Sequence, residues 1–265
     1  MDRVAHLLHG LRQRGPFAGD AEVTLEANPE GLAVGDAAAC RAAGVTRLSL
    51  GVQSFDDGDL RWLGRPHDGA TARRAVAEAL GAGLRVGLDL IYGLPGRSSG
   101  HWLAQLDAGV DTGVGHLSAY ELSVEPGTRL AAAWPDGLGD RTDLFFRTHD
   151  HLASRGFEGY EVSNFARSPQ HRSRHNLATW AHRTYLGLGP GAHSFLDGSS
   201  GPVRRWNLPD LEAWLAALEQ GAPPPRGEEV LTPDQRLLER VMLGVRTRTG
   251  VDLTACRQEC GEERT

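Results

Sequence analysis

Short strand-like runs alternate with helical runs along most of the chain, and this order constrains the fold more than any other feature. The strand-like runs cover residues 22–28, 46–52, 84–92, 116–123 and 160–166. Helical stretches lie before and between them, at residues 3–15, 37–44, 69–83, 100–110 and 141–156. Parallel strands need crossover connections, and these are usually helices. The sequence therefore predicts an α/β fold of parallel strands with outer helices.

The side chains of these strands alternate between a large apolar face and a face that is polar or small. Leu48, Leu50 and Val52 alternate with Ser49, Gly51 and Gln53, and the runs around Leu25 and Leu88 behave alike; in the fourth run, Glu121 and Ser123 share a face with Ala119. A parallel sheet covered on both faces reads as continuous Val, Ile and Leu, which these runs do not. If the sheet curls into a partial (β/α) barrel, its polar face lines a lumen that holds a ligand. The alternative is a half-solvated sheet in an α+β protein.

The domain organisation is predicted from a change in composition near residue 221. Residues 221–230 contain the run "GAPPPRG", which is stiff and favours a linker. We predict the partial barrel, with an extension, over residues 1–220, and the start of a C-terminal helical domain over residues 231–265.

Charge and cysteine content narrow the functional classes. The net charge of −6 argues against nucleic acid as the main partner, although basic residues gather at 167–174. No run reaches the length of a membrane span, and the N-terminus has no signal-peptide core. Three cysteines form no disulfide framework. We expect a cytoplasmic protein.

The polar face of the predicted sheet carries a specific chemistry. It contains Glu26, Gln53 and Asp89, and Arg65 follows the second strand. Carboxylates and an amide bind hydroxyl and ammonium groups, and an arginine binds a carboxylate. This set suits a nucleoside that bears an amino acid better than a triphosphate, and the chain has no P-loop or dinucleotide fingerprint. Each residue alone could be an ordinary surface ion-pair member.

Several longer motifs carry a family resemblance. The strings are "TLEANPEGL", "GVTRLSLGVQSFDDGDLRWLGRPH", "GLDLIYGLPG", "LSAYELSVEPGT" and "YEVSNFA" followed by "YLGLGPGAHS". From Val4 to Leu253 the chain resembles the oxygen-independent coproporphyrinogen III oxidase family of radical S-adenosylmethionine (SAM) proteins, and within it the haem chaperones. The resemblance implies a curved partial barrel. It also implies that SAM contacts Glu26, Gln53, Arg65 and Asp89, with Ser123 and His193 as two further positions.

The segment "HNLATW", residues 175–180, matches a further motif of that family. The haem chaperones carry HNxxYW, a motif associated with haem binding, and here Thr179 stands in place of the tyrosine. The resemblance implies that His175 is an axial ligand of haem iron, with Asn176 and Trp180 in the same site. Trp180 could stack on the macrocycle, and Arg172 or Arg174 could meet the propionates. The alternative is a helix capped by Asn176, with Trp180 buried and His175 in an exposed loop.

The family's [4Fe–4S] cluster is held by a CxxxCxxC motif upstream of "TLEANP". The chain has only Cys40, Cys256 and Cys260 and no such motif, so no cluster cysteines are present. We interpret the chain as truncated at both ends, without its first β/α units. We expect it not to cleave SAM.

Three functions follow from these observations. The first is a haem chaperone that, at full length, also binds SAM and a [4Fe–4S] cluster and delivers haem to acceptor proteins, membrane-associated ones included. The second is the oxidase itself, a radical SAM enzyme of porphyrin biosynthesis. The third is a serine hydrolase, from the string "GRSSG" around Ser98. A cap of the following helix by Ser98 or Ser99 explains that string more simply.

Overall fold

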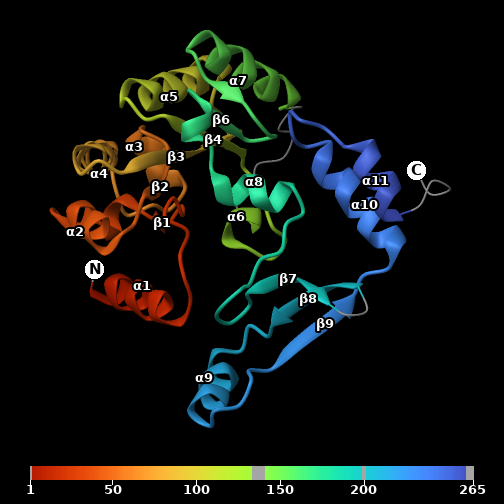
Figure 1. Ribbon diagram of the computed structural model, residues 1–265. Coiled ribbons are helices and arrows are strands. Elements are labelled where there is room, and N and C mark those ends of the chain that lie inside the picture. Colours follow the sequence, from red (N-terminus) through yellow and green to blue (C-terminus); the bar gives the residue numbers. More distant parts are fainter. Residues whose placement is uncertain (1, 133–140, 199–200, 261–265) are drawn as a thin grey trace. The chain divides into compact units, whose positions relative to one another are not determined.

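The computed structural model describes residues 2–132, 141–198 and 201–260 (Figure 1). The chain divides into two compact units, Met1–Arg172 (unit 1) and Ser173–Thr265 (unit 2). Each unit is described by itself. Among the described residues, no helix combines the length and apolarity needed to cross a membrane.

Unit 1 is built around one sheet of six strands, in the order β1-β2-β3-β4-β6-β5. The strands are β1 (Thr24–Ala27), β2 (Arg47–Gln53), β3 (Arg85–Tyr92), β4 (His116–Glu121), β5 (Glu158–Gly159) and β6 (Asn164–Ala166). The helices are α1 (Asp2–Arg14), η1 (Pro29–Gly31), α2 (Asp36–Ala43), α3 (Asp57–Trp62), α4 (Gly69–Gly81), α5 (Ser99–Asp111), α6 (Arg129–Ala132), α7 (Thr142–Ser154) and η2 (Pro169–His171).

The predicted α/β fold is confirmed, with one departure. Strands β1 to β4 pair in parallel, whereas β6 pairs antiparallel with both β4 and β5. In the predicted strand 160–166, only Asn164–Ala166 forms a regular strand. β5 and β6 are joined by a short turn, and strands joined in this way run antiparallel. The sheet is therefore mostly parallel.

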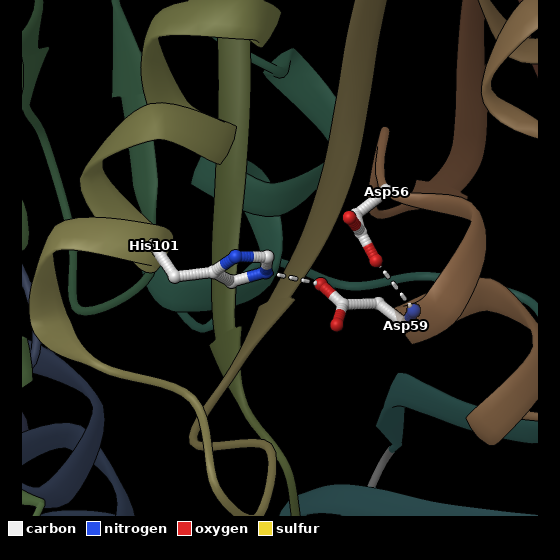
Figure 2. Close-up of side chains that lie close together, drawn as sticks. All are labelled: Asp56, Asp59 and His101. Atoms are coloured by element: carbon white, nitrogen blue, oxygen red, sulfur yellow. Dashed lines mark hydrogen bonds and ion pairs between the residues drawn. The ribbon is translucent and has the colours of Figure 1, made fainter.

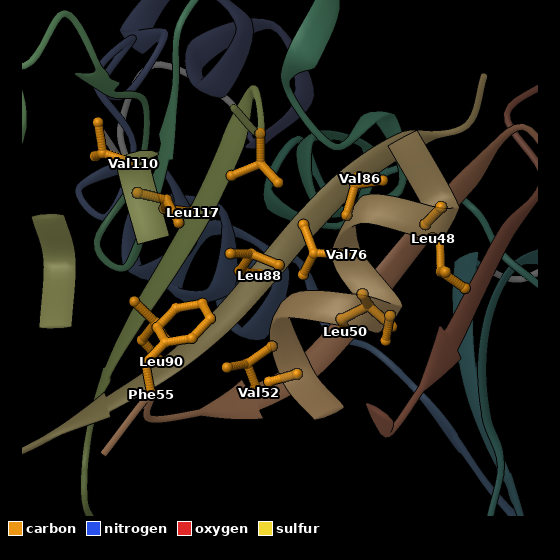
Figure 3. Close-up of a cluster of buried hydrophobic side chains, with 14 of the residues drawn as sticks. Leu48, Leu50, Val52, Phe55, Val76, Val86, Leu88, Leu90, Val110 and Leu117 are labelled. Atoms are coloured by element: carbon orange, nitrogen blue, oxygen red, sulfur yellow. The ribbon is translucent and has the colours of Figure 1, made fainter. Parts of the chain in front are cut away.

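The apolar face of the sheet packs against the outer helices, as the alternation predicts. Leu50 of β2 and Leu88 of β3 are fully buried with Val76 of α4 and Val110 of α5 (Figure 3). The opposite face of β2 is buried too. The fourth strand differs from its prediction: Ala119 lies on the core face with Leu117, so the polar face carries Ser118 and Tyr120 instead of Glu121.

Unit 2 contains a three-stranded antiparallel sheet that sequence patterns did not predict. Its strands are β7 (His193–Gly198), β8 (Gly201–Asn207) and β9 (Arg226–Val230), and its helices are α8 (Arg174–Trp180), α9 (Leu211–Glu219), α10 (Pro233–Gly244) and α11 (Leu253–Cys260).

The predicted linker, residues 221–230, is corrected by this sheet. Residues 226–230 form β9, which pairs with β8 from Val203↔Val230 to Asn207↔Arg226. A proline removes only its own backbone N–H from the hydrogen bonds of a sheet. The residues "RGEEV" after the prolines keep their backbone N–H donors and can pair. The chain divides at Arg172 and Ser173 and not at residue 220. Helical structure beyond residue 231 is observed in α10 and α11, while residues 261–265 lie outside the described part.

Candidate functional site

The structure brings Glu26 of β1 and Asp89 of β3 to the same polar face of the sheet, on either side of β2. Glu26 is in register with Ser49, and the Ser49 hydroxyl donates to Asp89 Oδ2 at 3.4 Å. On its other side Asp89 is in register with Ser118. Burial is the main cause of the raised pKa of Asp89, and the negative charge of Glu26 raises it further, while the Ser118 hydrogen bond and Arg47 oppose the rise. Two carboxylates so placed favour a cationic or hydroxyl-bearing ligand.

Gln53 ends β2 in an unusual backbone conformation. Its φ is +66°, a left-handed value that costs a non-glycine residue free energy, and the residue is only 9 % exposed. Gly51 makes room for it, because a Cβ there would lie 2.9 Å from Gln53 Nε2 and 2.8 Å from Asn28 Oδ1. Strain of this kind is concentrated at ligand sites, which supports the predicted role of Gln53.

Arg65 and Ser123 lie in loops of unit 1. Arg65 follows α3 and is half-buried, and its guanidinium makes no ion pair with any residue in the described ranges. Ser123 is exposed, two residues beyond the end of β4. Arg65 is thus available to a ligand carboxylate.

A buried network lies further along the same face, and sequence reasoning missed it. His116 Nε2 lies 2.8 Å from the Tyr160 hydroxyl, and its Nδ1 lies 3.4 Å from Arg47 Nη2. Gly87 makes room for the side chains of Arg47 and His116, because a Cβ at this position would lie within 3 Å of both. Burial lowers the pKa of His116 to about 3, so the ring is neutral at pH 7. The network depends on pairing between distant strands, which no local pattern reveals.

A cluster of possible metal ligands follows β2 (Figure 2). Ligand atoms of Asp56, Asp59 and His101 lie within 4.8 Å of one another. Asp59, however, accepts from Arg97 Nε at 2.5 Å and lies 2.7 Å from His101 Nε2, and Asp56 accepts from the Asp59 backbone N–H as the cap of α3. A guanidinium on the buried carboxylate disfavours a second cation. We interpret the cluster as a network that holds the loop after Gln53.

His193, the sixth predicted SAM position, lies in unit 2. It is the first residue of β7, is exposed, and stacks on Trp206 with ring centroids 6.3 Å apart.

The segment "HNLATW" forms most of α8, a helix capped by Ser173, whose hydroxyl accepts from the Asn176 N–H at 3.2 Å. Asn176 is therefore not the cap. His175 is exposed and Trp180 is half-buried. The Thr179 hydroxyl donates to the His175 carbonyl one turn earlier. Residues advance about 100° per position, so His175 and Thr179 share a face while Trp180 is rotated about 140° from His175.

Residues of α8 line two cavities, which share His182 and Arg183 but otherwise have different lining residues. A cavity of about 310 Å³, here called the Thr179 cavity, is lined by Thr179, Tyr185, Phe195, Met242, Leu243 and Arg183, among others. A second, of about 350 Å³, includes Trp180, Leu177, Arg240 and Val251. The structure therefore does not place His175 and Trp180 on one surface.

His182 is a buried histidine that no sequence signal marks. It takes a φ of +53°, stacks on Phe195 at 4.2 Å between centroids, and lies 3.1 Å from Glu239 Oε2 through Nε2. Burial lowers its pKa against the opposing effect of Glu239. Its Nδ1 is withdrawn from solvent and its Nε2 contacts Glu239, so His182 is a poor candidate for the ligand of a bound metal. The contact with Glu239 spans 57 positions, which explains why the sequence does not reveal it.

Two cysteines have side chains that the structure describes, and each lies within the packing of its own unit. Cys40 is buried in α2 of unit 1, where burial raises the pKa of its thiol, and Cys256 is buried in α11 of unit 2. A neutral, buried thiol is a poor iron ligand. Ser98 caps α5 by accepting from the His101 N–H at 3.1 Å, as the simpler interpretation of "GRSSG" predicts.

Comparisons with known proteins identify relatives of the chain. Residues 2–105 match the Radical SAM superfamily. The chain is 40% identical over 262 residues to the haem chaperone HemW of Mycobacterium tuberculosis H37Rv, covering 95% of this chain and 65% of the relative. It is 38% identical over 260 residues to the mitochondrial radical S-adenosyl methionine domain-containing protein 1 of Bos taurus, covering 94% and 58%.

Among solved structures, the chain is similar to coproporphyrinogen III oxidase (HemN) of Escherichia coli, with a TM-score of 0.81 at 23% identity. The match covers 98% of this chain and 63% of that one, and it shows the shared fold. The chain thus spans about 65% or less of the length of these relatives.

Proposed function

The chain belongs to the radical SAM family of HemW- and HemN-like proteins, and on this premise we propose that it binds haem and passes it to acceptor proteins. The observation that carries the proposal is the exposed residue His175 on α8, in a chain 40% identical to a haem chaperone. A neutral imidazole is a common axial ligand of haem iron. The match to the oxidase rests on 23% identity and does not favour an enzyme.

The proposal assigns SAM to unit 1. Radical SAM proteins use SAM with a [4Fe–4S] cluster, which supplies the electron for SAM cleavage. The residues proposed for SAM fit a zwitterion: Asp89 and Glu26 attract its cationic part, and Arg65 suits its carboxylate. Gln53 adds an amide held by a strained turn. Ser123, in unit 1, remains a proposed contact, and the role of His193, which lies in unit 2, stays a prediction from sequence. The described cysteines do not fit the cluster, so no step through it is derived.

We also propose a cellular compartment and a class of acceptor proteins. Cys40 and Cys256 form no disulfide, which suits the reducing cytoplasm. The acceptors are proposed to be haem-requiring proteins, membrane-associated ones included.

A haemin titration followed in the Soret region tests the proposal. We expect saturable binding by the parent chain and at least a tenfold loss of affinity, or a shifted Soret band, in His175→Ala. His9→Ala is the matched control, because His9 is also an exposed helical histidine but lies in α1 of unit 1. Equal, non-saturating uptake by all three proteins would contradict the proposal.

A further inference from the structure

The Thr179 cavity has apolar walls and an open mouth. Tyr185 of the loop and Met242 of α10 line it and are 41% and 43% exposed overall, and Phe195, which also lines it, is buried. His182 lines it as well, with its ring stacked on Phe195 and its Nε2 held by Glu239. Such a surface accepts a flat apolar ring, because Tyr, Phe and Met contacts are large and polarisable.

Two arginines line the cavity, and only one of them is open to a ligand. Arg204 is paired with Glu239 and with Glu229, so its charge is neutralised. Arg183 is exposed, and within residues 2–132, 141–198 and 201–260 its guanidinium makes no ion pair. An open guanidinium beside apolar walls favours a ring that bears a carboxylate.

The Thr179 cavity lies next to the proposed iron ligand on α8. Thr179 lines it, and His175 lies one helical turn earlier on the same face. Side chains four residues apart on a helix have Cβ atoms about 6 Å apart. Trp180 lines the other cavity, on the other side of α8.

We propose that one propionate-bearing pyrrole of the bound tetrapyrrole enters the Thr179 cavity, with its carboxylate on Arg183. This inference rests on the proposed function and gives the haem an orientation. The volume of about 310 Å³ is at the lower end for ligand pockets, so the cavity encloses one edge of the macrocycle. The rest of the ring lies along the His175 face of α8, and Trp180 does not stack on it.

Metal-free protoporphyrin IX is the probe, because it has no iron for His175 to bind. Its binding is followed by porphyrin fluorescence beside that of the dimethyl ester, which has no free carboxylate. The parent is expected to bind the acid about tenfold more tightly than the ester. Arg183→Gln should abolish that preference, and Thr179→Phe should weaken both ligands by filling the cavity.

Arg226→Gln is the matched control, since Arg226 is exposed on β9 and does not line the cavity. Circular dichroism melts check that each variant folds; Arg183→Gln changes an exposed side chain and does not depend on repacking. Parent-like affinities for acid and ester in both Arg183→Gln and Thr179→Phe would overturn the proposal, as would no binding of the acid by the parent.

The two proposals fail in different ways. A haemin spectrum that depends on His175, together with porphyrin binding that ignores Arg183 and Thr179, rejects only the cavity. Porphyrin binding that depends on Arg183, with a haemin spectrum that ignores His175, rejects only the iron ligand.

Discussion

The two units bury their side chains very differently. In unit 1, large apolar residues from Leu8 to Phe165 form one continuous core between the sheet and its helices. In unit 2, α8 and α9 bury no residue, every residue of β8 is half-buried, and Phe195 and Leu231 are among the few buried apolar side chains. Burial of apolar area is the main source of folding free energy. Unit 1 therefore supplies most of the folding stability, and unit 2 presents the surfaces proposed for haem.

Truncating one leucine in each unit should give the largest difference in stability between the two units. Leu88 of β3 is fully buried, whereas Leu215 of α9 is 46% exposed. We expect Leu88→Ala to lower the free energy of unfolding by about 2–5 kcal/mol, through lost transfer energy and a residual cavity. Leu215→Ala should cost less than about 0.5 kcal/mol. Urea unfolding followed by circular dichroism measures both. Equal losses would mean that α9 is part of a packed core.

His116, a buried histidine of unit 1, gives a smaller effect that depends on pH. Burial lowers the pKa of His116 in the folded state to about 3, and Arg47 and His171 add to the depression. The unfolded histidine, with a pKa near 6.5, binds a proton below that pH that the folded one does not. Stability is therefore full above pH 6.5 and falls as the pH drops toward 3.

Between pH 7 and pH 5 the His116 contribution should fall by about 2 kcal/mol. The measurement is the unfolding free energy at both pH values for the parent and for His116→Gln, whose amide is neutral throughout and can still meet the Tyr160 hydroxyl. The difference between the two proteins removes the effects of other groups. A parallel decline in both proteins would show that His116 is not the cause.

The structure of unit 1 could be predicted from the sequence better than that of unit 2, because unit 1 has the larger buried core. In unit 1, alternation at Leu48, Leu50 and Val52 predicted both the strand and its buried face, because a core imposes a period on the residues that build it. In unit 2, β8 is half-buried throughout and carries no such period, so its sheet was missed. Within the site, Glu26, Gln53 and Asp89 could be placed on one face from their spacing alone. The separation of His175 from Trp180 required a helix at residues 174–180, and the burial of His182 required α10.

Removing the helix caps should have the smallest effect on stability, and the effect should differ in kind between the two units. Ser98 caps α5 in unit 1 and Ser173 caps α8 in unit 2, each by accepting one backbone N–H. Replacing either by alanine should cost about 1 kcal/mol locally. α5 buries Trp102 and Leu106, so the Ser98→Ala loss should appear in the global unfolding free energy. No residue within α8 is fully buried, so Ser173→Ala should fray α8 alone, raising its amide hydrogen exchange and weakening haemin binding at His175. If both variants lowered global stability equally, α8 would unfold together with the core. The conclusion that unit 1 supplies most of the folding stability would then be wrong.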